Sequence, residues 1–140
     1  MRRLFMLLAG VAAGGMAAAA PPAMKPGLWE ITTSMEMPGM PRSMPPTKIK
    51  RCYRAEEVQD LRRTLPEQQK ANCTTSDWKQ SGNTVNWTVS CGGDTPMTMT
   101  GSMTYAGDRY SGVSRMRMSQ GGQVMHMTQK YDARRIGDCP

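Results

Sequence analysis

The stretch Met97–Tyr131, MTMTGSMTYAGDRYSGVSRMRMSQGGQVMHMTQKY, decides the fold. From Met97 to Tyr105, methionine, glycine and tyrosine alternate with threonine and serine. This period of two is typical of a half-buried β-strand. Gly107-Asp108 and Gly121-Gly122 are residue pairs that favour two-residue hairpin turns. The stretch therefore predicts three antiparallel strands joined by two tight turns.

Each turn determines which residues lie opposite one another on neighbouring strands. The first turn places Tyr105 opposite Tyr110, and the second places Met118 opposite Met125 and Gly112 opposite Tyr131. One face of the sheet then carries methionine, tyrosine and glycine, whereas the other face carries Thr98, Thr100, Arg115, Arg117, His126, Thr128 and Lys130. Two turns and three alternating strands agree on this register, and such agreement favours the sheet.

The N-terminus has the features of an export signal. Arg2 and Arg3 precede an apolar stretch, residues 4–13, that is too short to remain as a membrane-spanning helix. Small residues follow up to Ala20, so we expect a signal peptide at residues 1–20 that is cleaved near Ala20. A retained anchor is the alternative, but we expect no stable membrane anchor. Residues 21–140 are expected to form a single antiparallel β domain.

The net charge of the chain is +7, and two of the positive charges belong to the export arginines. No run of lysine and arginine is interleaved with aromatic residues, so a nucleic-acid groove is poorly supported and no nucleic-acid partner is expected. A solvated basic surface explains the charge, and weak attraction to anionic surfaces is the alternative.

The four cysteines all lie after the export signal. An even number of cysteines in an exported chain predicts two disulfides. The turn at 81–83 lies midway between Cys73 and Cys91 and favours that pair, which leaves Cys52 to join Cys139. Cys73 has an odd residue number and Trp78 an even one, so in a regular strand their side chains would point to opposite faces. A β-bulge is therefore expected between them if Trp78 shares a face with Trp87.

The rest of the chain predicts further strands and one helix. Alternating residues favour strands at 29–37, 48–53, 74–79 and 84–91, and prolines favour a loop at 40–47. Residues 55–65 predict one short helix, with Glu56 and Glu57 in its first turn and an apolar stripe of Val58, Leu61 and Leu65. Residues 134–140 are expected to form a tail. The fold class is therefore mainly β: a curved antiparallel sheet or small open barrel of six to seven strands.

Several of these motifs, in their order, resemble domain-of-unknown-function family 3617 (DUF3617). They are Pro26-Gly27-Leu28-Trp29-Glu30 after the export signal, the cysteines around the short helix and the hairpin, and Arg135-Ile136-Gly137-Asp138-Cys139 at the end. The resemblance covers nearly all of the chain after the signal. It implies a small exported bacterial protein located in the periplasm, and it implies no activity.

Residue patterns give little support to catalysis. His126 is the single histidine and falls on the polar face by parity, without a Ser or Cys nucleophile assigned near it. The acidic residues show no paired spacing that suggests acid–base chemistry. We therefore expect no enzyme and no cofactor.

Methionine is the compositional anomaly, with 15 methionines against one phenylalanine. A methionine-filled core explains most of it, but flexible thioethers also suit a surface that adapts to apolar ligands. We therefore expect a non-enzymatic binding or interaction domain for an apolar small molecule, a lipid or an envelope protein. The ligand-facing candidates are Met99, Met103, Tyr105, Tyr110, Met116, Met127 and Tyr131.

Two alternatives remain open. The first is a structural envelope factor without a ligand. The second is a protein that handles Cu(I), because thioethers are soft ligands and four of them lie close together in the sequence at Met35, Met37, Met40 and Met44. Met35 and Met37 share parity with Trp29, so they are also explained as the continuation of a buried strand face.

Overall fold

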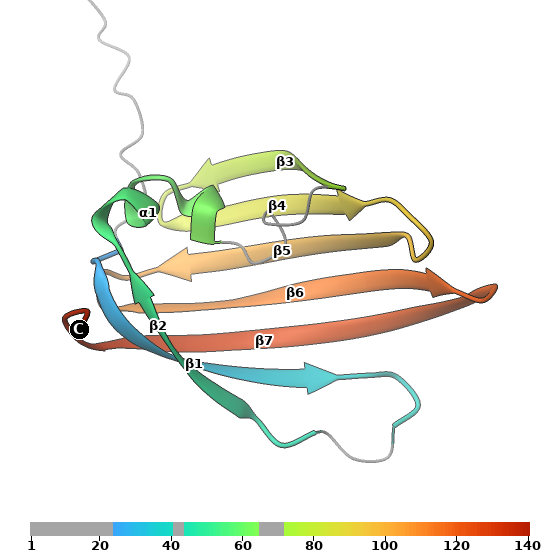
Figure 1. Cartoon of the computed structure of the whole chain (residues 1–140), viewed down its shortest axis with the longest axis horizontal. Helices are drawn as coiled ribbons and strands as arrows, with labels where there is room; N and C mark the ends of the chain where they lie inside the picture. The colour runs from blue at the N-terminus through green and yellow to red at the C-terminus, as the bar shows by residue number, and fades with distance from the viewer. Residues whose placement is uncertain (1–23, 41–43, 65–71) are drawn as a thin grey trace, which may run out of the picture.

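The computed structural model describes residues 24–40, 44–64 and 72–140, and these form one open antiparallel sheet (Figure 1). The expected signal peptide lies outside the described residues. The strand order is β2-β1-β7-β6-β5-β4-β3. The strands are β1 (Gly27–Glu36), β2 (Thr47–Tyr53), β3 (Cys73–Ser81), β4 (Thr84–Cys91), β5 (Met97–Tyr105), β6 (Arg109–Gln120) and β7 (Gln123–Gly137). Among the described residues, no helix has the length and apolar character needed to span a membrane.

The predicted register of the β5–β6–β7 meander is confirmed. Tyr105 pairs with Tyr110, Met118 pairs with Met125, and Gly112 pairs with Tyr131. The second turn places both of its glycines at positive φ, 57° and 76°. Glycine adopts such angles readily, and the turn type that best matches the twist of a hairpin requires them at both central positions.

α1 (Ala55–Gln59) and η1 (Leu61–Thr64) follow β2 in the chain and lie over one face of the sheet, which we call the inner face (Figure 1). β1 and β2 curl over this same face. Leu61 of η1 is buried. The Arg62 guanidinium lies 5.2 Å from the centre of the Trp78 ring on β3. The inner face is thus covered at the end of the sheet where α1 lies.

The prediction of one helix over 55–65 is only partly right. α1 ends at Gln59, Asp60 is extended with φ −128° and ψ 93°, and η1 is a separate turn of 3-10 helix. The Asp60 carboxylate accepts a hydrogen bond from the backbone N–H of Arg62, 3.2 Å away. Such a local side-chain bond offers the backbone an alternative to the helical pattern, and it explains the break. Leu65 lies outside the described residues.

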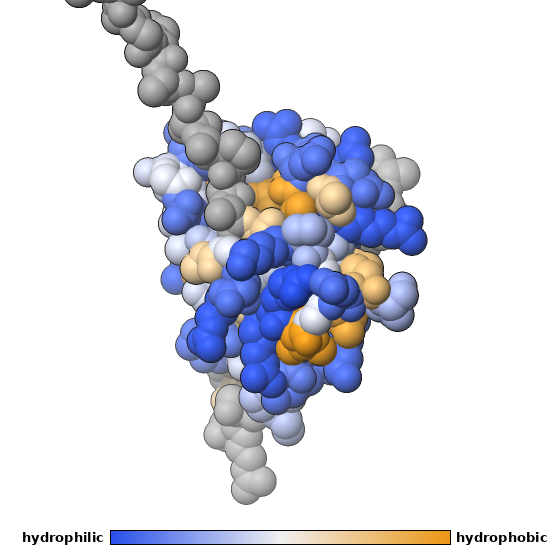
Figure 2. Space-filling view, turned by 90° about the vertical axis from the view of Figure 1, so that its left-hand side faces the viewer, coloured by the Kyte–Doolittle hydropathy of each residue, from blue (hydrophilic) through white to orange (hydrophobic). Residues whose placement is uncertain are grey.

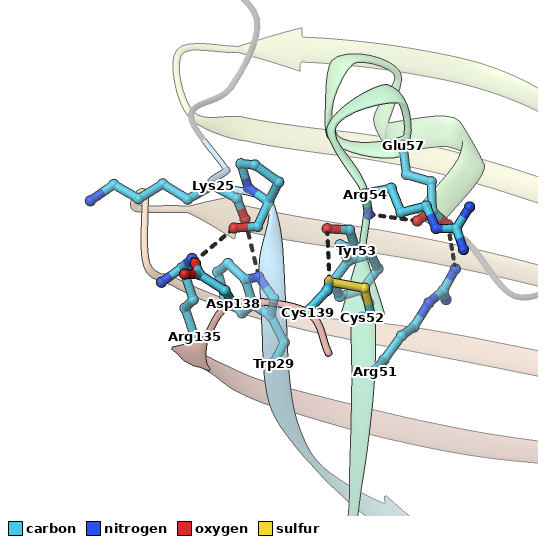
Figure 3. The surroundings of a disulfide bond; sticks show 11 residues. Lys25, Trp29, Arg51, Cys52, Tyr53, Arg54, Glu57, Arg135, Asp138 and Cys139 are labelled. Carbon is cyan, nitrogen blue, oxygen red and sulfur yellow. Dashed lines mark hydrogen bonds and ion pairs between the residues drawn. A yellow bond between two sulfur atoms is a disulfide. The ribbon is translucent and has the colours of Figure 1, made fainter.

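The prediction of a tail over 134–140 is also only partly right, because β7 continues to Gly137. Its last residues pair with the beginning of β1. Arg135 donates a hydrogen bond to the carbonyl oxygen of Pro26 at 2.8 Å and forms an ion pair with Asp138. The Cys52–Cys139 disulfide then joins the end of the chain to β2 (Figure 3). The two terminal motifs that resemble DUF3617 are therefore in direct contact.

The second disulfide and the β-bulge occur as predicted. Cys73 and Cys91 lie opposite each other on β3 and β4 and form a disulfide. The register shifts between Ser76 and Lys79, and Asp77 within this shift has a positive φ of 54°. The shift brings Trp78 beside Trp87, with ring centres 6.4 Å apart.

The core lies on the inner face and runs across all the central strands. Its fully buried large side chains are Trp29, Val85, Val89 and Met99. Outward residues of the same strands are mostly exposed and polar. The alternation in the sequence is thus the alternation between a packed face and a solvated face.

Candidate functional site

A cavity of about 280 Å³ lies on the inner face, between the sheet, β2 and η1. Its lining is mainly apolar and aromatic, and it is drawn from β1, β2, η1 and β4 to β7 together with Met24. Five of the seven predicted ligand-facing residues line it: Met99, Met103, Tyr105, Tyr110 and Tyr131. Small-molecule sites span roughly 300–1,000 Å³, so this cavity suits a small ligand or one apolar chain.

Met116 and Met127 do not line the cavity. They pair with each other and Met116 pairs with Met99, so they continue the inner face beyond the cavity toward the β6–β7 turn. Sequence reasoning also missed part of the lining. The alternation of side chains along β1 and β2 could have placed Ile31, Thr33 and Ile49 on the inner face. No local sequence pattern predicts that η1 brings Thr64 over the sheet.

Two tyrosines that line the cavity, Tyr53 and Tyr110, pack against the buried Trp29 ring. Trp29 stacks on Tyr110 with ring centres 5.3 Å apart, and Tyr53 meets Trp29 edge-on at 6.2 Å. The hydroxyl groups of Tyr53 and Tyr110 are hydrogen-bonded to each other at 3.1 Å. Burial raises the pKa of Tyr105 to about 12, and burial together with the nearby Tyr53 also raises the pKa of Tyr110. Both phenols therefore stay protonated and neutral at neutral pH.

Among the described residues, Arg51 is the one cation that lines the cavity, and its guanidinium already has partners. Its guanidinium lies 4.6 Å from the centre of the Tyr53 ring. It donates hydrogen bonds to the Glu57 carboxylate at 3.3 Å and to the Thr64 carbonyl oxygen at 3.2 Å. These bonds tie β2 to α1 and η1, and they neutralise the guanidinium charge beside the cavity (Figure 3).

A short chain of hydrogen bonds crosses the apolar wall. Ser114, which is 1% exposed, shares a hydrogen bond of 3.1 Å with the Tyr131 hydroxyl. The Tyr131 hydroxyl in turn donates to the side-chain carbonyl oxygen of Gln129. The Gln129 amide nitrogen lies 3.7 Å from the Met35 sulfur and 3.8 Å from the Met127 sulfur. Its oxygen thus accepts a hydrogen bond from a hydroxyl, whereas its amide nitrogen lies near two thioether sulfurs, which are weak acceptors.

Trp87 contributes a buried donor without an acceptor. The side chain is 4% exposed, and among the described residues its indole N–H has no hydrogen-bond partner. The ring lies across Gly101 on the neighbouring strand, where an added Cβ would approach ring atoms to 2.5 and 2.7 Å. Because Gly101 has no side chain, the indole can lie flat on the sheet and line the cavity.

Three of the four methionines of the alternative metal site have different surroundings. Met35 points to the inner face beside Gln129, whereas Met40 and Met44, in the connection between β1 and β2, are 55% and 38% exposed. His126 is exposed on the outer face of β7. In the part of the chain that the structure describes, no group of three or more His, Cys, Asp or Glu side chains is placed to hold a metal ion.

The end of the molecule that carries α1 and the C-terminus has a mainly hydrophilic surface (Figure 2). Hydrophobic residues appear there as small patches separated by polar ones. The polar groups that line the cavity, by contrast, are neutral hydroxyl, amide and indole groups set in apolar walls, together with the Arg51 guanidinium that is paired with Glu57. This chemistry suits binding through packing and a few oriented hydrogen bonds.

The comparisons with known proteins agree with the terminal motifs. No curated protein and no solved structure matches the chain. A family model described as "Protein of unknown function (DUF3617)" matches residues 24–139. This match covers the whole sheet, both disulfides and the cavity, so the chain belongs to the DUF3617 family.

Proposed function

We propose that this protein is a non-enzymatic periplasmic binding domain that holds an apolar small molecule or one chain of a lipid. The observation that carries the proposal is the apolar cavity of about 280 Å³ between the sheet, β2 and η1. Well-packed interiors have few voids larger than a water molecule, so a cavity of this size is a candidate binding site.

The composition of the cavity walls supports an apolar ligand. Met99 and Met103 contribute flexible, polarizable side chains that adapt to different shapes, and the aromatic groups offer broad apolar surfaces. The two raised tyrosine pKa values mean that these buried phenols bring no negative charge into the cavity at neutral pH. The Arg51 guanidinium, which also lines the cavity, donates a hydrogen bond to the Glu57 carboxylate.

A periplasmic location is supported by the chemistry of the cysteines. All four cysteines are paired in disulfides. Disulfides persist in oxidising compartments such as the periplasm and are rare in the cytosol. The features of residues 1–20 that suit an export signal point to the same compartment.

A probe titration tests the proposal. Phenylnaphthylamine, an apolar dye whose emission rises when it leaves water, is titrated into the protein and into two variants of β1. Thr33→Phe fills the cavity, because Thr33 lines it. Thr32→Phe places the same ring on the outer face of the same strand and is the matched control. We expect saturable binding by the wild type and the control, and at least tenfold weaker binding by Thr33→Phe.

Equal binding by both variants, or no saturable binding by the wild type, would contradict the proposal. Circular dichroism of both variants shows whether the sheet is retained. If the protein instead binds an envelope protein or has a purely structural role, the dye should show no saturable binding at a defined site.

Soft-metal handling is the second candidate, and one contact favours it. The sulfurs of Met35 and Met127 both lie within 3.8 Å of the same Gln129 nitrogen, so two thioethers face one point. Two thioethers make a weak Cu(I) site, and Met40 and Met44 are exposed on the connection between β1 and β2. We therefore expect no tight Cu(I) binding in an anaerobic competition titration. Tight one-to-one binding that Met35→Leu/Met127→Leu abolishes would put the metal function first.

A further inference from the structure

Beyond the cavity, the inner face of the β5–β6–β7 meander consists of methionine side chains. Met97 pairs with Met118 and Met118 with Met125, whereas Met116 and Met127 form a pair closer to the cavity. We call these five residues the methionine surface. Four of them are half-buried, and Met125 is 46% exposed. Because none of the five lines the cavity, the cavity alone does not account for them.

The methionine surface begins at the cavity wall. Gln129 lines the cavity, and its amide nitrogen lies 3.8 Å from the Met127 sulfur. Met99 also lines the cavity, and it pairs with Met116 on the neighbouring strand. An apolar chain that leaves the cavity on the side of Gln129 and Met99 therefore meets methionine side chains directly.

The two ends of the inner face differ in how they are covered. α1 and η1 lie over one end (Figure 1), and Leu61 of η1 is buried there. In the described part of the chain, Figure 1 shows no helix or strand over the β6–β7 turn at the other end. Exposed apolar surface of this kind often marks a binding site. The end that carries the methionine surface is thus the end at which a bound molecule reaches water.

The dimensions of the site favour a chain that is longer than the cavity. The cavity of about 280 Å³ lies at the lower limit of small-molecule sites, which span roughly 300–1,000 Å³. Gln129 and Met125 are four positions apart on β7. Four strand residues cover about 13 Å, which an extended alkyl chain of about ten carbon atoms spans. Flexible thioethers suit such a chain, because it has no fixed shape.

The polar groups of the cavity determine which end of the chain enters. The hydroxyls of Tyr53 and Tyr110 bond to each other, and Arg51 is paired with Glu57. A charged head group buried beside them would lack a free cation, which is strongly unfavourable. The chain therefore enters with its apolar end, and its head group stays in water near the β6–β7 turn.

We propose that the ligand is a lipid with one long acyl chain, whose apolar end fills the cavity and whose remaining length lies on the methionine surface. This inference rests on the proposed binding function, and it adds the length and the direction of the chain. It also gives a role to the methionines that lie outside the cavity.

The experiment measures how affinity depends on chain length. Decanoate, dodecanoate, tetradecanoate and hexadecanoate, each below the concentration at which it forms micelles, are used to displace phenylnaphthylamine. A methylene group that lies on an open apolar face loses about half of its contact with water, so affinity should rise about twofold for each methylene up to hexadecanoate. Equal affinities for dodecanoate and hexadecanoate would overturn the inference.

Met125 and Val124 provide a matched pair of variants. They are neighbours on β7 and both are 46% exposed, but Met125 pairs with Met118 on the inner face and Val124 belongs to the outer face. Met125→Asn should weaken hexadecanoate binding about fivefold, the contribution of two or three methylenes. Val124→Asn should leave it unchanged, and both variants should bind the dye as the wild type does.

A spectroscopic readout in the wild type covers the case in which Met125→Asn fails to fold. The protein is labelled with ¹³C at the methionine methyl groups, and the Met125 signal is assigned by its absence in Met125→Leu. Hexadecanoate should shift this signal, and decanoate should leave it near its free position.

The outcomes separate the two claims. If the dye binds but hexadecanoate does not displace it, or if Met125→Asn and Val124→Asn weaken hexadecanoate equally, the long-chain inference fails and the binding function stands. An unshifted Met125 signal with bound hexadecanoate leads to the same conclusion. Failure of the dye and of all four fatty acids to bind would overturn the binding function, and the inference with it.

Discussion

At the scale of single residues, glycines let large side chains and backbone come close on the inner face. Gly101 lies under the Trp87 indole, and Gly112 lies against Met103 and the carbonyl oxygen of Ser102. A Cβ at Gly112 would approach the Met103 sulfur to 2.6 Å and its Cα to 3.0 Å. The alternation of residues in the sequence indicated that Gly112 faces inward. Its close contact with the Ser102 backbone depends on the twist of the sheet, so no local sequence pattern predicts it.

Gly112→Val should therefore destabilise the protein more than Val113→Thr, which changes the neighbouring residue on the other face. Overpacking of a tight site costs about 1–3 kcal/mol, and the backbone carbonyl of Ser102 cannot move aside as a side chain can. Urea denaturation of both variants measures the difference in the free energy of unfolding. Equal stabilities would show that position 112 is not packed as described.

The buried tyrosines predict how stability depends on alkaline pH. Burial raises the pKa of Tyr105 from 10.0 to about 12, so between these values Tyr105 ionises in the unfolded chain and not in the folded one. The stabilisation is complete below about pH 10 and is lost as the pH rises toward 12, and two pKa units correspond to about 3 kcal/mol. Tyr105→Phe should flatten the loss of stability over this range in urea melts. An unchanged slope would mean that Tyr105 ionises alike in both states.

At the scale of elements, the strands were predictable because alternation, turn residues and parity agree. The sequence predicted even the β3–β4 bulge, because Cys73 and Trp78 differ in parity but both pack toward the core. The helix break was not predicted. The spacing of apolar residues around Asp60 is compatible with a continuous helix. The break becomes visible only in the structure, where the Asp60 carboxylate accepts a hydrogen bond from the Arg62 N–H. The extension of β7 to Gly137 was also missed, because its pairing partner lies more than a hundred residues earlier on β1.

The bulge predicts that two substitutions at Asp77 differ in their effect on stability. Its φ of 54° lies in the left-handed region, where a β-branched residue is strained by about 1–2 kcal/mol and glycine is not. Asp77→Gly should therefore be more stable than Asp77→Val, although both variants lose the carboxylate. Thermal unfolding followed by circular dichroism compares them. Greater stability of Asp77→Val would argue for a regular strand at this position.

At the scale of the whole molecule, the covered inner face depends on how the ends of the chain are joined. β2, α1 and η1 lie over this face, and the Cys52–Cys139 disulfide fixes β2 to the C-terminal segment (Figure 3). The sequence predicted most of the methionine and tyrosine lining of the cavity from the parity of β5 to β7. It could not predict the role of Thr64 or Arg51, because their positions depend on the path of β2, α1 and η1.

The two disulfides should contribute unequally to stability. Cys52 and Cys139 are separated by 87 residues, and Cys73 and Cys91 by 18. Loop-closure entropy then gives about 4–5 kcal/mol for the first bond and about 3 kcal/mol for the second. Replacing each pair by serine and measuring urea unfolding should show the larger loss for Cys52→Ser/Cys139→Ser. The reverse order would mean that β2 is held mainly by packing.

The central claim is that the cavity holds one apolar molecule. Native mass spectrometry of the protein recovered from its own cells tests this most directly, with Thr33→Phe and Thr32→Phe prepared in the same way. We predict that the wild type and Thr32→Phe carry one small apolar molecule per chain and that Thr33→Phe carries none. A bare chain mass in all three proteins, or a ligand that Thr33→Phe retains in full, would contradict the account.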